Sequence, residues 1–179
     1  MAETYMPDSD FDHNEFPLAY LITIRCYGTW LHGDNRMSVD RHGFNIFGAP
    51  RRVANSRLER VMSGKIKLEP VLLNETQRAV VKEAITEVCD YRGYDLKAIN
   101  VRTNHAHAVV SAQSSPEPIV NAFKSYSTRK LREARALSND VHPWARGKSQ
   151  RYLWKPLHVS RAIDYVLYGQ GDIIPDFDD

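Results

Sequence analysis

The segment NHAHAVVSA, residues 104–112, constrains the fold more than any other part of the chain. Successive side chains of a β-strand point to opposite faces of the sheet, so Ala106, Ala108 and Val110 share one face and can pack beneath a helix. His105 and His107 then lie side by side on the other face. The sequence therefore predicts a strand over residues 105–112 that presents two imidazoles to one side of a sheet.

The rest of the chain alternates between strand-like and helical patterns. Runs rich in β-branched and aromatic residues predict strands at residues 16–31, 95–101, 105–112 and 151–154. Helical periodicity predicts helices at residues 74–93, 114–137 and 158–172. The order βαββα, followed by βα, predicts an α+β fold of the ferredoxin-like sandwich type, with an antiparallel sheet and helices packed on one face.

Helix ends and buried stripes can also be read from the sequence. Asn74 and Gln77 have the spacing of a capping box, Gly93 ends that helix, and Ser115 with Pro116 begins the next. The second helix is expected to bury Ile119, Val120, Phe123, Ser127, Leu131 and Ala134. The last helix is expected to bury Val159, Ala162, Ile163, Val166 and Leu167.

The length of 179 residues fits one domain, predicted at 16–172 with a long polar insert at 32–73. An acidic, flexible N-terminus at 1–15 and an acidic tail at 173–179 flank it. There is no apolar run of membrane-spanning length and no secretory signal pattern, so a cytoplasmic protein is expected. Cys26 and Cys89 are far apart and are predicted to be reduced core thiols.

Positive charge is concentrated in one part of the chain. Residues 116–161 hold ten Lys or Arg against Glu117, Glu133 and Asp140, which is a pattern typical of proteins that meet phosphates, although a solvated helix face would look the same. The candidate DNA-binding residues are Lys124, Arg129, Lys130, Arg132, Arg151, Trp154 and Lys155. The aromatic rings near residue 150 could stack on bases or could be buried in an edge strand.

Neutral imidazole suits Mn²⁺, Zn²⁺ or Fe²⁺ as a ligand, and Mg²⁺ less well. The pair His105 and His107 could therefore hold a metal, or could simply be hydrogen-bonded at a sheet surface. Tyr126, in the helix after the histidine strand, is a candidate nucleophile because Lys124, Arg129 and other cations within one turn favour phenolate. The alternative is a core tyrosine.

Together these features resemble the single-tyrosine HUH transposases, the family of small insertion-sequence and REP-associated transposases. The resemblance rests on His105, Ala106 and His107, on Tyr126 in FKSYSTRKL, and on the tail SQRYLWKPLHVSRAIDYVLYGQGD, covering about residues 16–31 and 74–172. It implies a single-stranded DNA endonuclease and strand transferase that forms a 5′-phosphotyrosine. It also implies a divalent metal, Mg²⁺ or Mn²⁺, on the two histidines, Tyr126 as nucleophile, and a homodimer acting on single-stranded or hairpin DNA.

The chain departs from the family at the third metal ligand, which is commonly Gln or Asn four residues after the tyrosine. Lys130 occupies that position after Tyr126, and its ammonium group has no lone pair for a metal. Glu133 is the first substitute expected. Residues His32, Asp34 and His42 of the insert are others.

Two other functions remain open on the sequence. A domesticated relative could bind single-stranded nucleic acid without catalysis, having lost the metal site. A small metal hydrolase could use the two histidines without a covalent intermediate, in which case Tyr126→Phe would keep its activity.

Overall fold

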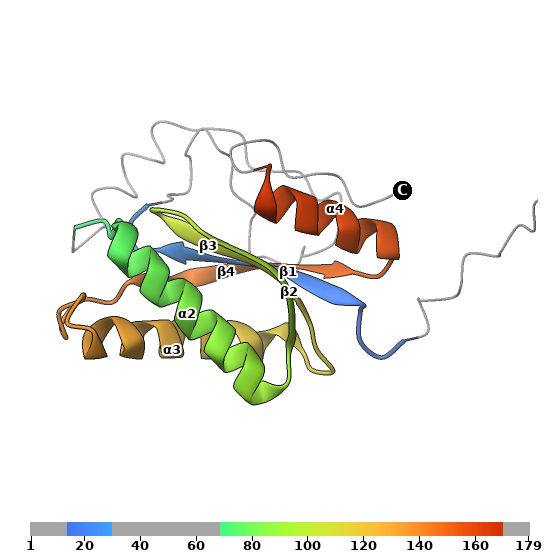
Figure 1. Ribbon diagram of the computed structural model, residues 1–179, viewed down its shortest axis with the longest axis horizontal. Helices are drawn as coiled ribbons and strands as arrows, with labels where there is room; N and C mark the ends of the chain where they lie inside the picture. Colours follow the sequence, from blue (N-terminus) through green and yellow to red (C-terminus); the bar gives the residue numbers. More distant parts are fainter. Residues whose placement is uncertain (1–13, 30–68, 170–179) are drawn as a thin grey trace, which may run out of the picture.

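The computed structural model describes residues 14–29 and 69–169, which form a four-stranded sheet covered by three helices (Figure 1). The strands are β1 (Ala19–Cys26), β2 (Asp95–Val101), β3 (His105–Ser111) and β4 (Trp144–Leu153). The helices are α2 (Glu75–Arg92), α3 (Pro116–Glu133) and α4 (Pro156–Leu167). The order along the chain, βαββαβα, is the predicted one, and the α+β class is confirmed.

The sheet is antiparallel throughout, with the strand order β2-β3-β1-β4. This order places β1 and β3 in the centre, which explains why both are rich in apolar residues. β4 is an edge strand and is longer than the predicted segment 151–154, because Trp144 pairs with Cys26 across an irregularity in β1. The histidine strand therefore has neighbours on both sides.

Helices cover both faces of the sheet. α2 and α3 pack on the face that carries Ala106, Ala108 and Val110, as expected for the apolar row of β3. α4 lies on the opposite face against Leu21, Val109 and their neighbours (Figure 1). The prediction of helices on one face thus holds for the two longer helices, and the third builds a separate small core over the histidine face.

The predicted helix signals are largely present. Gly93 ends α2 in the left-handed conformation, with φ of 67°, which glycine adopts without a Cβ clash. Pro116 is the first residue of α3, after Ser115, whose side chain makes no capping hydrogen bond. Ala134 was expected to be buried and is exposed, because α3 ends there.

The capping box at the start of α2 gives a first testable result. Asn74 Oδ1 accepts from the Gln77 backbone N–H, and Gln77 Oε1 accepts from the Asn74 backbone N–H, both at 2.9 Å. Asn74→Ala is expected to lower the free energy of unfolding by about 1 kcal/mol, measured by urea denaturation, since one donor loses its partner. Asn74→Asp should keep most of the free energy of unfolding that Asn74→Ala loses. Equal midpoints for wild type and Asn74→Ala would contradict this role.

Both cysteines are buried and unbridged, as predicted. Burial raises the pKa of Cys26 and of Cys89 to about 12, so both are neutral thiols at physiological pH. None of the described helices is long and apolar enough to span a membrane. The predicted acidic ends lie almost entirely outside the described residues, as does the insert at 32–73 apart from its last five positions.

Candidate active site

The two histidines of β3 lie next to each other on the face that α4 partly covers. Their ring centroids are 4.5 Å apart, and the planes are inclined by 69°. His107 is 5% exposed, whereas His105 is half-buried. In the register with β1, His107 lies opposite Thr23 and His105 opposite Arg25, so these four side chains share one patch of the sheet. The predicted side-by-side placement is therefore present.

Each imidazole has a hydrogen-bond partner at Nδ1. His105 Nδ1 lies 2.6 Å from Asn104 Oδ1, and an amide oxygen only accepts, so Nδ1 carries a proton, and in the neutral ring the lone pair is then on Nε2. His107 Nδ1 lies 2.8 Å from Thr23 Oγ1, a hydroxyl that can accept in the same way. Such partners fix the tautomer and the ring orientation of metal-binding histidines.

His107 is held in its neutral form. The pKa of His107 is lowered from 6.5 to about 3, first by burial and then by the neighbouring His105, Arg25 and Arg102, which oppose a positive charge on its ring. A neutral imidazole keeps the lone pair that a metal ligand needs. The same cations make the patch attractive to phosphate.

This pKa shift predicts a specific loss of stability in acid. Between pH 6.5 and about 3 the unfolded chain binds a proton at His107 and the native chain does not, so the free energy of unfolding falls as the pH falls. The slope from this group is at most about 1.4 kcal/mol per pH unit. His107→Asn, which can still bond Thr23, should flatten the curve in that window in urea titrations at several pH values. Parallel curves would show that His107 does not carry the effect.

Tyr165 of α4 completes this group, and the sequence interpretation did not single it out. Its ring centroid lies 5.5 Å from that of His107, with planes inclined by 68°, and the residue is 8% exposed. Asn100, the β2 residue opposite His107, donates from Nδ2 to the Val166 carbonyl at 3.0 Å. This bond ties α4 to the sheet beside the histidines. The structure therefore brings together one tyrosine and two imidazoles.

Tyr126, the tyrosine expected to act with the histidines, lies on the other side of the sheet. It packs against the core formed with α2 and α3, and the Arg129 guanidinium carbon lies 4.4 Å from its ring centroid. β3 itself separates it from His105 and His107 in the same chain. The expectation that Tyr126 shares their site is corrected, and Tyr126 is a partly buried core residue.

The expected third ligand, Glu133, also lies away from the histidines. Glu133, at the end of α3, pairs with Arg129 at 3.6 Å on the face away from the histidines. Lys130 pairs with Glu87 of α2 at 2.8 Å. Among the described residues, no group of three His, Cys, Asp or Glu side chains is placed to hold a metal. The alternatives His32, Asp34 and His42 lie outside the described residues.

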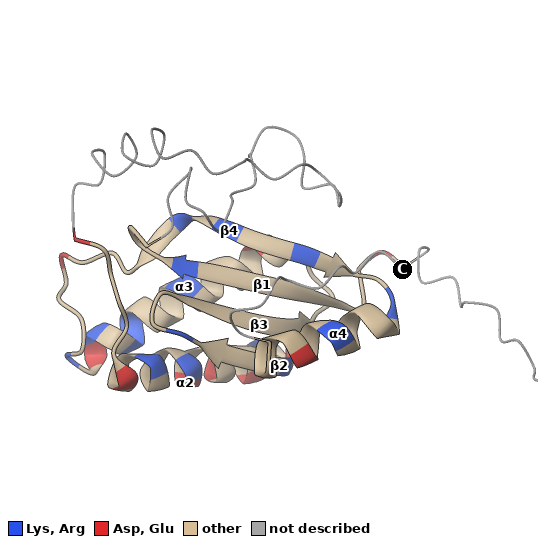
Figure 2. Ribbon diagram, turned by 90° about the horizontal axis from the view of Figure 1, so that it is seen from above, with Lys and Arg blue, Asp and Glu red and all other residues tan. Residues whose placement is uncertain are grey.

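The candidate DNA-binding cations fall into two groups. Lys124, Arg129, Lys130 and Arg132 belong to α3, on the face away from the histidines. Arg151 pairs with Leu21, whose side chain contacts the α4 core, so Arg151 is on the histidine face. Figure 2 shows Lys and Arg positions along β4 and β1 beside the part of the sheet that α4 leaves uncovered.

Trp154 and Lys155 connect β4 to α4. The rings of Trp154 and Tyr152 are nearly parallel, inclined by 16° with centroids 6.4 Å apart, and Tyr152 is 43% exposed. Lys155 precedes Pro156, the first residue of α4. Trp154 and Lys155 therefore come directly before the helix that carries Tyr165.

Comparison with known proteins identifies the family. The model of the family described as "Transposase IS200 like" matches residues 57–156, which include both histidines and end before Tyr165. A REP-associated tyrosine transposase bound to a REP hairpin shares the fold, with a TM-score of 0.50 and 13% identity over 94% of this chain and 72% of that one.

A candidate transposase from Deinococcus radiodurans R1 aligns with a TM-score of 0.43 and 14% identity over 97% of this chain and 98% of that one. No curated protein matches significantly. The family match covers more than half of the 179 residues, and the chain therefore belongs to the IS200-like transposase family.

Proposed function

We propose that this transposase cleaves and rejoins single-stranded DNA through a covalent link to Tyr165, with His105 and His107 as metal ligands. The observation that supports it most directly is the contact of Tyr165 with His107 across the interface between α4 and β3. Nucleophile and metal ligands would then come from one chain. A homodimer, which the resemblance implies, would not be needed to assemble this site.

The proposed step is a transesterification that needs no external energy. The Tyr165 oxygen loses its proton and attacks the phosphorus of a phosphodiester, so a bond from phosphorus to the tyrosine oxygen forms. The bond from phosphorus to the 3′ oxygen breaks, and that oxygen takes up a proton. The products are a 5′-phosphotyrosine and a free 3′-hydroxyl. The reverse step with another 3′-hydroxyl rejoins the strand.

The histidine pair fits a divalent cation. Both rings have a partner on Nδ1, which is the arrangement that leaves Nε2 as the ligand atom. A metal held there would polarise a phosphoryl oxygen and offset the charge that develops on it. Arg25 and Arg102 are close enough to lower the His107 pKa, and their charges also favour the approach of the DNA backbone.

With Tyr165 as the nucleophile, the position at which the family commonly has its third ligand is no longer Lys130, because it is counted from the tyrosine. Four residues after Tyr165 is Gly169, and the next residue is Gln170, which lies outside the described residues. Gln170 carries an amide oxygen, one residue beyond the position that the family commonly uses. We propose Gln170, in place of Glu133, as the residue that would supply the third ligand.

The experiment that tests this proposal is covalent capture of DNA. The protein is incubated with end-labelled single-stranded hairpin oligonucleotides and Mn²⁺ or Mg²⁺, and the products are separated on a denaturing gel. The hairpin is a suitable probe because the REP-associated transposase of similar fold is bound to one. A metal-dependent protein–DNA adduct is expected.

Two other outcomes identify the rival functions. Strand binding with no adduct across a broad oligonucleotide library would favour the noncatalytic binder, which also agrees with the absence of a third His, Cys, Asp or Glu beside the pair among the described residues. Cleavage with no adduct would favour the metal hydrolase.

A further inference from the structure

Asn100 of β2 links the sheet to the last turn of α4, at the residue that follows Tyr165. Its Nδ2 lies 3.0 Å from the carbonyl oxygen of Val166. A carbonyl only accepts, so the bond fixes which end of the Asn100 amide faces the helix. In the strand register Asn100 lies opposite His107, and directly paired residues share a face of the sheet. The bond therefore joins the strand beside the histidines to the residue next to Tyr165.

Apolar packing holds α4 against the sheet but fixes its rotation only weakly. Ala162 and Val166 of the helix belong to one buried cluster with Leu21, Ala98 and Val109 of the strands. The hydrophobic effect that favours this burial is non-directional, and alanine side chains are too short to interlock deeply with their neighbours. A hydrogen bond weakens steeply once its angle departs from the ideal. The bond from Asn100 therefore resists small rotations of α4 that the apolar contacts would tolerate.

The bond acts on the turn of α4 in which Tyr165 lies. In that turn the Gly169 N–H donates to the Tyr165 carbonyl at 3.0 Å, and Val166 is the last residue but one of the helix. Carbonyl groups in the last turn of a helix run out of helical N–H donors, and helix ends fray. Asn100 gives one of these carbonyls a donor from the sheet. It therefore anchors the end of α4 that carries Tyr165.

We propose that Asn100 is a positioning residue, which holds the last turn of α4 so that the Tyr165 ring stays against His107. This inference rests on the proposed function in taking Tyr165 as the nucleophile. The two rings meet edge to face with centroids 5.5 Å apart, an arrangement that a small rotation of α4 would change. Misplacing a reacting group by about 1 Å can cost roughly 100-fold in rate. Loss of the bond should therefore slow the attack by Tyr165 without weakening the binding of metal or DNA.

The placement of Tyr165 can be measured without DNA or metal. An aromatic ring shifts the NMR signals of protons beside it, so the ring signals of isotope-labelled His107 report where the Tyr165 ring lies. Asn100→Leu removes the amide donor at similar volume, and should move these signals toward those of Tyr165→Leu, which has no ring there. In the Tyr165→Leu background the same substitution should move them far less, because the signals would no longer depend on the ring.

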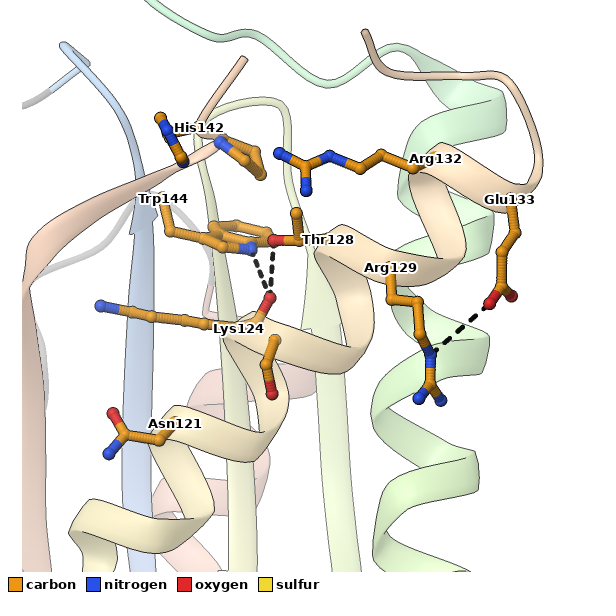
Figure 3. A pocket seen from close by; sticks show the side chains of 10 residues that line it. Asn121, Lys124, Thr128, Arg129, Arg132, Glu133, His142 and Trp144 are labelled. Atoms are coloured by element: carbon orange, nitrogen blue, oxygen red, sulfur yellow. Dashed lines mark hydrogen bonds and ion pairs between the residues drawn. The ribbon is translucent and has the colours of Figure 1, made fainter. Parts of the chain in front are cut away.

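Control variants separate loss of the bond from general effects on the protein. Asn121→Leu makes the same substitution at an exposed side chain of α3, which lines a groove on the other face of the sheet (Figure 3). Asn74→Ala is expected to destabilise the protein at the start of α2. Neither should move the His107 signals. Asn100→Gln keeps an amide donor on a longer side chain and should restore most of the wild-type signals.

The rate of adduct formation is the second readout. At saturating hairpin DNA and Mn²⁺, Asn100→Leu should slow adduct formation in a single turnover by about tenfold, with Mn²⁺ and DNA affinities at their wild-type values. Asn100→Gln should react within about threefold of the wild-type rate. Asn74→Ala should react like the wild type, although it is less stable. Thermal unfolding of each variant checks that the fold is intact.

The outcomes separate this inference from the proposed function. If the wild type forms no adduct, the proposed function fails, and a movement of the His107 signals in Asn100→Leu that needs the Tyr165 ring still supports the hold of Asn100 on α4. Unchanged His107 signals in Asn100→Leu would overturn the inference, even with full adduct formation by the wild type. Equal movements with and without the Tyr165 ring, or the same movement in either control, would overturn it too. A Tyr165-dependent adduct that forms at the wild-type rate in Asn100→Leu would have the same meaning.

Discussion

Tyr165→Phe is expected to abolish the covalent protein–DNA adduct and to slow strand cleavage by at least about 10³-fold. The substitution removes the oxygen that we propose as the nucleophile, and a phenyl ring has no group that could replace it. The ring itself still fills its place against His107 and the α4 core. The measurement is the denaturing-gel assay with labelled hairpin DNA and Mn²⁺, together with single-strand affinity, which should stay near the wild-type value.

Two other tyrosines serve as matched controls. Tyr126→Phe should keep wild-type cleavage, because that side chain packs with α2 and α3 beyond the sheet. Tyr168→Phe should also be active, although it lies only three residues from Tyr165, because its side chain is 82% exposed. Loss of the adduct in Tyr126→Phe with an intact adduct in Tyr165→Phe would reverse the assignment. It would then require Tyr126 to reach the histidines of a partner subunit.

The period-two pattern of β3 was sufficient to predict the histidine pair. His105 and His107 must share a face in any strand, and the small apolar residues between them favour burial of the opposite face. Both features are present, and Ala106 and Ala108 are each 2% exposed beneath the two long helices. The local sequence pattern is enough to predict which side chains share a face, because this depends on a single strand.

The proposed nucleophile depends on how α4 is rotated about its axis, and the buried stripe predicted from the sequence was wrong there. The expected stripe counted only aliphatic residues and ended at Leu167, which is 42% exposed. The helix instead turns His158, Ala162 and Tyr165 toward the sheet, at spacings of four and three residues. Histidine and tyrosine have apolar rings with polar tips, so they pack inward where a polar partner exists. A predicted stripe that included histidine and tyrosine would have placed Tyr165 on the buried face of α4.

The side of the sheet that each helix covers could not be read from periodicity. Both faces of β1 are apolar, since Ile22 and Ile24 contact the α2 and α3 core while Leu21 contacts α4. Nothing local says which face receives which helix. The pairing of Thr23 with His107 is also a long-range feature of strand order. The predicted partnership of Tyr126 with the histidines failed for this reason, because sequence proximity to β3 was taken for proximity in space.

The second large effect is expected from substitutions that weaken metal binding at the histidine pair. His105→Ala is expected to weaken Mn²⁺ binding by at least about 100-fold and to abolish adduct formation, because it removes one of the two imidazoles proposed as ligands. Thr23→Val tests the group behind His107. It removes the hydroxyl 2.8 Å from Nδ1 at nearly constant volume, and should cost about 10-fold to 100-fold in metal affinity. Isothermal titration with Mn²⁺ measures both, independently of cleavage.

The cations around the pair predict how that metal affinity depends on DNA. Arg25 and Arg102 already oppose positive charge on His107, so they also oppose a divalent cation in the free protein. A phosphodiester beside them adds negative charge and supplies oxygen ligands. Mn²⁺ should therefore bind at least about tenfold more tightly to Tyr165→Phe saturated with uncleaved single-stranded DNA than to the same variant alone, and by linkage Mn²⁺ should tighten DNA binding by the same factor. Equal Mn²⁺ affinities would mean that the histidines and the bound strand do not share a site, and the metal role of His105 and His107 in cleavage would be lost.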